Sequence, residues 1–219
     1  MIRAIVGANW GDEGKGKITD MYAADSDLVI RFQGGANAGH TIINDKGRFA
    51  LHLLPSGVCY SHTVNIIGNG VALNIPSFYN ELSALKKLGI NPKILISDRA
   101  QIVMPYHVLF DQYEEERLGG KQFGSTKSGI APFYSDKHQK KTVLAGELFY
   151  PEELRTHLYD LMEWKNLTLT RIYGAKPYTR QMLNKWIFDY CEKIKPFVCD
   201  AGAFLKNASR SGKKILFEA

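Results

Sequence analysis

Short apolar runs alternate along the chain with longer segments in which apolar residues recur at helical spacing. The short runs predict strands, and the longer segments predict amphipathic helices. Strands are predicted at residues 2–6, 27–32, 48–54, 64–67, 93–97 and 213–218, and helices at residues 76–88, 105–118, 151–164 and 179–197. This alternation is typical of an α/β fold with a mostly parallel central sheet flanked by helices. Because the sequence has no repeat and no linker-like stretch, we expect a single domain over residues 1–219.

Several finer features follow from the same pattern. The strands at residues 2–6 and 213–218 are expected to be buried, since their side chains are largely apolar. The sequence Gly68-Asn69-Gly70 predicts a turn, and the glycine-bearing residues 123–137 predict an irregular binding loop. Four aromatic residues of the last two helices are expected in the core rather than on a base-stacking platform, namely Trp164, Trp186, Tyr190 and Phe197.

The first predicted strand is followed by a glycine-rich loop with the sequence GANWGDEGKGKITD, and then by a helix that begins near Ile18. Strand, glycine-rich turn and helix together present backbone N–H groups to an anion. Residues 11–17 fit the pattern G-x-x-x-x-G-K, but Ile18 stands where a P-loop has a serine or threonine that helps to hold magnesium. Asp12 or Glu13 could supply that oxygen ligand instead. A plain helix-capping turn would have no use for two lysines and two carboxylates, so we favour phosphate chemistry with a metal.

A second glycine-rich segment, QGGANAGHT at residues 33–41, follows the strand at 27–32. It carries one histidine, His40, among glycines, alanines and an amide. A lone histidine is more often a packed structural residue, but here a catalytic role is favoured. The reason is that Asp12 and His40 follow two strands whose carboxyl ends would meet at one edge of the sheet, where ligands of open α/β sheets bind.

Five motifs, in the same order, resemble the adenylosuccinate synthetase family. They are WGDEGKGK at residues 10–17, QGGANAGHT at 33–41, LHLLPSG at 51–57, IIGNGV at 66–71 and GSTKSGIAPFYSDK at 124–137. The resemblance implies a P-loop-like nucleotide-binding fold of that type. It also implies a GTP-dependent ligase of purine biosynthesis, which joins IMP and L-aspartate through 6-phosphoryl-IMP and forms a homodimer in the cytoplasm.

The same resemblance assigns roles to individual residues. Asp12 matches the general base that takes the N1 proton of IMP, and His40 matches the acid that stabilises charge at the 6-oxygen. Asp12 and the carbonyl of Gly39 match the Mg²⁺ ligands. The implied GTP contacts are Gly11, Asp12, Glu13, Gly14, Lys15, Gly16, Lys17, Gly39, His40 and Thr41. The implied IMP contacts are Asp12, Glu13, Gly14, Lys15, Asn37, Ala38, Gly39, His40, Thr126 and Lys140.

The sequence departs from the family pattern near Thr126. Lys127-Ser128 stands where the family has Gly-Arg, and Ala131 replaces a common glycine. The family donates an arginine across its dimer interface to the IMP phosphate, and Lys140 is the best positional match here. A lysine keeps the charge but loses the bidentate fork. The alternative is that Lys140 and Lys141 are only solvated surface charge.

The composition is that of a globular intracellular protein. The 219 residues include 28 basic and 22 acidic side chains, hence 28 − 22 = +6. Anionic nucleotides account for this modest excess, and neither nucleic acid nor a membrane is expected as a partner. The three cysteines are widely spaced, which argues against a disulfide framework or a zinc site.

In the family, the strand at residues 213–218 leads into a second half that carries the aspartate-binding loop and the guanine-specificity residues. We therefore expect the chain to be an N-terminal portion without significant ligase activity of its own. Two alternatives remain: a module that binds or hydrolyses GTP without ligating anything, and a non-catalytic dimerisation fragment.

Overall fold

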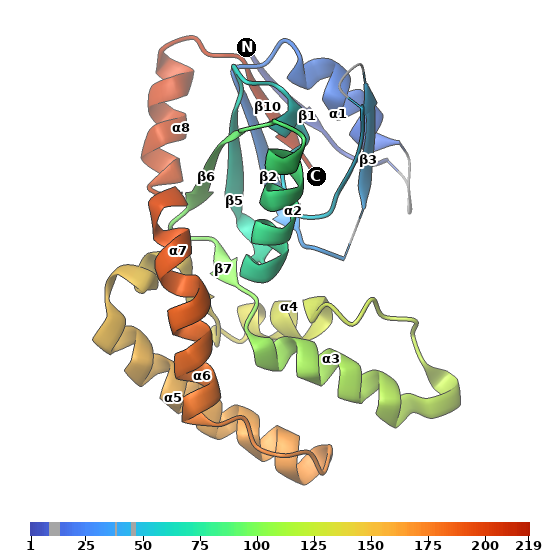
Figure 1. The fold of residues 1–219 in the computed structure, drawn as a ribbon, viewed down its shortest axis with the longest axis vertical. Helices are drawn as coiled ribbons and strands as arrows, with labels where there is room; N and C mark the ends of the chain where they lie inside the picture. Colours follow the sequence, from blue (N-terminus) through green and yellow to red (C-terminus); the bar gives the residue numbers. More distant parts are fainter. Residues whose placement is uncertain (9–13, 38, 45–46) are drawn as a thin grey trace.

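The computed structural model describes residues 1–8, 14–37, 39–44 and 47–219. Its centre is a parallel sheet with the strand order β1-β10-β2-β5-β6-β9 (Figure 1). These strands are β1 (Ile2–Ile5), β10 (Ile215–Glu218), β2 (Leu28–Gly34), β5 (Val64–Leu73), β6 (Lys93–Ser97) and β9 (Val198–Cys199). Two short strands extend it beyond the end of β5, namely β7 (Gln101–Ile102), which is parallel to β5, and β8 (Val143–Leu144), which is antiparallel to β7.

Helices cover both faces of this sheet. On one face α8 (Ala201–Arg210) packs through Ala201 on Ile30, Ile66 and Ile215. On the other face α1 (Lys15–Ala23) packs through Ala23 on β2 and β10, and α2 (Ile75–Lys87) lies beside it. Because register partners in parallel strands share a face, the apolar residues of β2, β5 and β10 divide cleanly between these two layers.

The remaining helices lie beyond the carboxyl end of β5, in the lower part of Figure 1. The α-helices are α3 (Pro105–Leu118), α4 (Ile130–His138), α5 (Pro151–Leu167), α6 (Arg180–Trp186) and α7 (Glu192–Ile194). Short 3-10 turns are η1 (Ser56–Cys59), η2 (Gly119–Lys121), η3 (Ala145–Phe149) and η6 (Lys195–Phe197), and the π-helical turns are η4 (Thr168–Ile172) and η5 (Ile187–Cys191). One hydrophobic cluster runs from α2 through α3 and α5 to α6, so the helical part and the sheet share a core.

The predicted fold class is confirmed, since the sheet is mostly parallel and has helices on both faces. The helix predicted at residues 105–118 is α3 with the same bounds. The predicted burial of the strand at 213–218 is also confirmed, because Leu216 is fully buried between β1 and β2.

Two strand predictions are wrong. The first strand is exposed rather than buried, because β1 is an edge strand of the sheet that the described residues form and pairs there with β10 alone. The predicted turn at residues 68–70 does not exist, and β5 continues through it to Leu73. A Cβ on Gly70 would lie 2.1 Å from the carbonyl oxygen of Phe32. The glycines are therefore needed for close approach to β2 beside the bulge between Arg31 and Gln33.

Three further predictions need correction. Residues 123–137 are irregular only as far as Gly129, where α4 begins. The strand predicted at 48–54 is β4 (Gly47–Leu51), which forms a separate antiparallel hairpin with β3 (His40–Asn44). Among the aromatic residues, Trp186 is buried and Tyr190 and Phe197 are half-buried on the core, but Trp164 is 52% exposed. The ammonium group of Lys141 lies 4.2 Å from the Trp164 ring centroid, so this ring supports a cation instead.

Candidate nucleotide site

The part of the glycine loop that the structure describes ends the loop and opens α1. Gly14 is the N-cap residue, with φ +79°, a left-handed conformation that favours glycine. Lys15 is the first helical residue and is half-buried, whereas Lys17 is exposed. Within this turn the N–H groups of Lys17 and Ile18 donate to the Gly14 carbonyl oxygen at 3.2 and 3.4 Å, and the N-terminal end of such a helix is suited to bind an anion. The predicted site residues Gly11, Asp12, Glu13 and Ala38 lie outside the described residues.

The first turn of α1 lies directly against the second glycine-rich segment. A Cβ on Gly16 would be 3.4 Å from the carbonyl oxygen of Thr41 and 3.6 Å from the Cβ of His40. The structure therefore brings the lysine-bearing loop and the histidine-bearing segment together, as the sequence predicted. Glycine at position 16 allows this approach without displacing either backbone.

His40 occupies a different place in the fold from the one expected. It does not end the strand at residues 27–32; β2 ends at Gly34, and His40 is the first residue of β3. Its side chain is half-buried, whereas Asn37, Gly39 and Thr41 are exposed. The segment between β2 and β3 thus presents three of the predicted contact residues to solvent and holds the imidazole at the edge of the hairpin.

A second histidine lies beside Gly39. The Cε1 atom of His52 would be 3.4 Å from a Cβ placed on Gly39, so its ring packs on that backbone. The segment that follows β4 is fixed by one carboxylate, because Glu81 of α2 accepts hydrogen bonds from three successive backbone N–H groups, those of His52, Leu53 and Leu54, at 3.1, 2.8 and 3.0 Å. The position of His52 is therefore set by α2.

Arg31 also holds the segments that contain Gly35 and His52. Its guanidinium is 2% exposed and donates hydrogen bonds to the carbonyl oxygens of His52 and Gly35. The carboxylate of Glu218 lies nearby and accepts hydrogen bonds from the Ser56 N–H at 3.0 and 3.1 Å. Burial raises the pKa of Glu218 and lowers that of Arg31, while their opposite charges counteract both shifts. One buried arginine thus ties the segment before His40 to the segment containing His52.

Thr126 lies on a loop that two carboxylates of α3 hold. Asp111 accepts hydrogen bonds from the Ser125 hydroxyl and from the Gly129 N–H at 2.8 Å. Glu115, one turn further along α3, accepts from the N–H groups of Phe123 and Gly124 at 3.1 and 3.2 Å. Thr126 itself is exposed, and its hydroxyl lies 2.5 Å from that of Ser128.

Lys140 does not join this loop within one chain. It is exposed, it has φ +60°, and it follows the last turn of α4, whereas Thr126 precedes the first turn. Nine helical residues at about 1.5 Å each separate the two ends of α4 by roughly 13 Å. Lys141 is not simply solvated, because its ammonium group lies over Trp164.

Sequence reasoning missed the residues that support these segments. Asp111 and Glu115 carry a signal, since their i,i+4 spacing places both carboxylates on one face of α3. Arg31 and Glu81 carry none, because Glu81 binds backbone atoms far away in sequence and Arg31 links the nearby Gly35 carbonyl to the distant carbonyl of His52. His52 lies within the motif LHLLPSG, which by itself assigns it no role.

The described residues contain neither a metal-ligand cluster nor a membrane-spanning helix. Within that part of the chain, no three His, Cys, Asp or Glu side chains come close enough to form a metal site by themselves. Within the same ranges, no helix is both long enough and apolar enough to cross a bilayer.

Comparison with known proteins gives consistent matches. The family model described as adenylosuccinate synthetase matches residues 4–219. Curated adenylosuccinate synthetases from Dehalococcoides mccartyi and Alkaliphilus metalliredigens are each 43% identical and cover 99% and 98% of this chain. The chain spans about half the length of these relatives, 52% and 50% respectively.

Solved structures agree with this result. The fully ligated adenylosuccinate synthetase from Plasmodium falciparum matches 99% of the chain with a TM-score of 0.84 and 34% identity, over 50% of its own length. A cyanophage S-2L succinoaminodeoxyadenylate synthetase, bound to dGMP and dATP, matches with a TM-score of 0.56 at 20% identity, which shows a shared fold alone.

Proposed function

Because this chain belongs to the adenylosuccinate synthetase family, we propose that it supplies the phosphate-binding and catalytic part of a GTP-dependent ligase that joins IMP and L-aspartate. The observation that carries this proposal is the contact of Gly16 with His40 and Thr41. It places the N-terminus of α1, which suits a polyphosphate, beside an imidazole, which suits a purine oxygen.

In the proposed reaction, Asp12 takes the N1 proton of IMP, and the 6-oxygen attacks the γ-phosphate of GTP. His40 donates a hydrogen bond to that oxygen and stabilises the charge that develops there. The amino group of aspartate then displaces the phosphate from carbon 6. Phosphoryl transfer depends mainly on positioning and charge neutralisation, so the lysines and backbone N–H groups of residues 11–17 would contribute most of the rate enhancement.

We propose Mg²⁺ as the cofactor, held by Asp12 and the carbonyl oxygen of Gly39. A carboxylate and a carbonyl are oxygen ligands that this cation prefers, and Gly39 is exposed beside His40. When bound, the cation would neutralise charge on the GTP phosphates. The remaining ligand contacts are proposed as predicted from the sequence, with Gly11, Glu13, Gly14, Lys15, Gly16, Lys17, His40 and Thr41 on GTP, and with Glu13, Gly14, Lys15, Asn37, Ala38, Gly39, His40 and Thr126 on IMP.

We also propose a cytoplasmic homodimer in which Lys140 of a second copy reaches the IMP phosphate near Thr126. The length of α4 supports a second copy as the source, because it keeps Lys140 and Thr126 of one chain apart.

The test combines binding with IMP-dependent GDP release. Isothermal titration of the chain with GTP and with IMP, in the presence of Mg²⁺, should give binding that Lys15→Ala weakens at least tenfold. Lys86→Ala is the matched control, since this exposed lysine lies on α2 away from the site. In a full-length enzyme that carries this chain as its first half, His40→Asn should leave GTP affinity nearly unchanged but abolish IMP-dependent GDP release and adenylosuccinate formation.

The same measurements distinguish the proposed ligase from a module that only binds or hydrolyses GTP. A module that only hydrolyses GTP would release GDP at a rate independent of IMP and insensitive to His40→Asn. Either result would contradict the proposed ligase.

A further inference from the structure

Helix α4 connects the two segments on which the proposed IMP contacts lie. The phosphate loop, defined as residues 124–129, leads into its first turn. The purine segment, defined as residues 34–41, comes from the end of β2 and the start of β3. These segments are far apart in sequence, so their relative position depends on what holds α4 against the sheet.

The hydroxyl group of Tyr134 makes this connection. It accepts a hydrogen bond from the Gly34 N–H at 3.1 Å and donates one to the Gly70 carbonyl at 3.0 Å. It therefore joins α4 to β2 and to β5 at the point where β2 turns into the purine segment. Burial raises the pKa of the Tyr134 phenol, so the group stays a neutral donor over the physiological range.

The contact is reinforced by packing at the first turn of α4. A Cβ on Gly35 would be 2.6 Å from Cδ1 of Ile130, so the purine segment rests directly on this helix. A Cβ on Gly129 would be 2.8 Å from backbone atoms of His107 and Val108, so α4 also starts in direct contact with α3. Gly129 cannot be replaced without moving α4 away from α3, whereas a side chain at Gly35 would have to displace the end of the Ile130 side chain.

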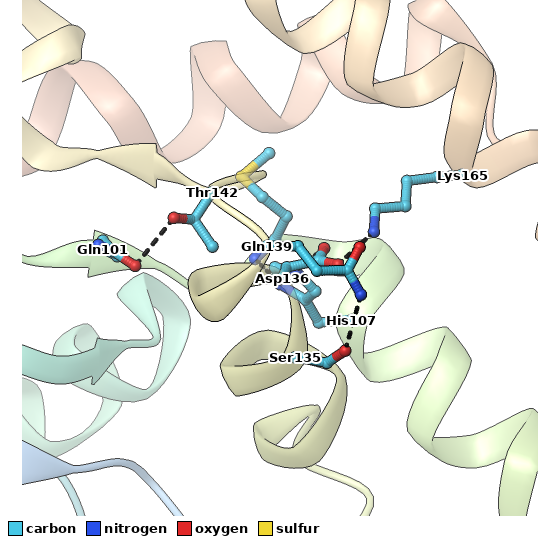
Figure 2. Close-up of polar contacts among 8 residues, drawn as sticks. Gln101, His107, Ser135, Asp136, Gln139, Thr142 and Lys165 are labelled. Atoms are coloured by element: carbon cyan, nitrogen blue, oxygen red, sulfur yellow. Dashed lines mark hydrogen bonds and ion pairs between the residues drawn. The ribbon is translucent and has the colours of Figure 1, made fainter.

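The other end of α4 is fixed by a buried polar cluster (Figure 2). Asp136 accepts hydrogen bonds from His107 of α3 at 2.9 Å and from Lys165 of α5 at 2.5 Å. Because α4 is held at Asp136 and, through the Gly129 N–H, by Asp111 of α3, Tyr134 acts on a helix that is already anchored to the helical part. The Tyr134 hydroxyl then links this anchored helix to β2 and β5 of the sheet.

We propose that Tyr134 is a positioning residue that sets the distance between the purine segment and the phosphate loop. This inference rests on the proposed function, because it assumes that both segments contact the same nucleotide. When two parts of one ligand are held at the right separation, binding of one part raises the effective concentration of the other. Tyr134 is not among the proposed ligand contacts. It acts on the ligand indirectly, through its hydrogen bond to Gly34 and through the position of α4.

The test compares Tyr134→Phe with Tyr79→Phe in the 219-residue chain. The Tyr79 hydroxyl is the matched control, since it is buried on α2 and has no hydrogen-bond partner within the described part of the chain. Affinities for IMP, inosine and inorganic phosphate are measured separately by NMR titration. Tyr134→Phe removes the hydrogen bonds to Gly34 and Gly70 and should weaken IMP binding about three- to tenfold, an effect of the size of one typical hydrogen bond. Inosine and phosphate binding should stay unchanged.

Several outcomes would overturn the inference. One is an IMP affinity no lower than that of Tyr79→Phe, and another is an equal loss for inosine or for phosphate, which would mean local damage to one segment. If the wild-type chain binds no IMP, the proposed function fails for this chain, and amide hydrogen exchange decides the inference. Positioning predicts faster exchange at both Gly34 and Gly129 in Tyr134→Phe, whereas acceleration confined to Gly34 would refute it.

Discussion

Replacement of Asp136 by asparagine tests how the buried cluster holds α4. In the native chain the Met104 N–H donates to Nδ1 of His107 at 2.9 Å, so Nε2 carries the proton and donates to Asp136. Burial opposes ionisation of Asp136, but the hydrogen bonds from His107 and Lys165 outweigh it and lower the pKa of the carboxyl. Burial also lowers the pKa of His107, which keeps the imidazole neutral. The carboxylate is therefore the counter-charge of Lys165.

The free-energy cost of Asp136→Asn can be estimated from the burial of the two charged side chains. The side chains of Asp136 and Lys165 are 6% and 4% exposed, so Asp136→Asn leaves an ammonium group in the interior without an opposite charge. Breaking such a pair costs about 3–5 kcal/mol. We expect a value near the lower end, about 3 kcal/mol, because the amide oxygen still accepts one hydrogen bond. With an m-value of about 2–3 kcal/mol/M, the urea midpoint should fall by roughly 1–1.5 M.

Equilibrium urea unfolding at neutral pH, followed by circular dichroism, measures this cost. Asp189→Asn is the matched control, because Asp189 pairs with Lys185 on an exposed helical face and its loss should cost less than about 0.5 kcal/mol. The double variant Asp136→Asn/Lys165→Met should recover most of the loss. Methionine removes the stranded charge and keeps the apolar stem that lies against Tyr106 and Phe110.

Two results would refute the reasoning. The first is an Asp136→Asn variant that is no less stable than Asp189→Asn. The second is a double variant whose loss equals the sum of the single losses, since independent effects would mean that Asp136 and Lys165 are not coupled.

Three further predictions concern stability. Gly70→Ala should destabilise the chain by about 3 kcal/mol or more in urea unfolding, because the new methyl group would overlap a carbonyl of β2, whereas Gly120→Ala, which has open space, should change stability by less than about 1 kcal/mol. A hydrogen bond from His157 to Glu147 raises the pKa of His157, so its contribution is fully present below pH ~6.5 and is lost as pH rises through the folded pKa. The difference in unfolding free energy between wild type and His157→Gln should shrink over that rise by less than about 1 kcal/mol, and a difference constant with pH would contradict the assignment. Glu81→Gln should cost about 1–3 kcal/mol and speed amide exchange in the segment after β4, and unchanged exchange there would count against its role.

The sequence predicted the elements whose pattern is local. The apolar spacing of residues 105–118 defines α3 by itself, and the glycines and lysines before α1 carry their own chemical signal. The proximity of the two glycine-rich segments was predicted as well, although His40 reaches α1 from the start of β3 and not from the end of β2.

The features that sequence reasoning missed depend on distant partners. Gly68 and Gly70 look like a turn in isolation, and only the neighbouring backbone of β2 explains why glycine lies within a strand. Residues 123–137 contain many helix-breaking residues, so the start of α4 at Ile130 depends on Asp111, which binds the Gly129 N–H. In the same way, Arg31 is recognisable as a structural residue only once its carbonyl partners are known.

The position of β10 has a consequence for how the chain folds. This strand lies between β1 and β2, so residues 215–218 pair with residues 2–5 on one side and with residues 28–31 on the other. Closing a loop of more than about two hundred residues is entropically costly and slow. During synthesis on the ribosome, β1 therefore has no strand partner in this sheet until β10 emerges. The first strand to be made is among the last to be locked in place, and α1, which packs through Ala23 on Leu216 of β10, gains this contact only at the same late step.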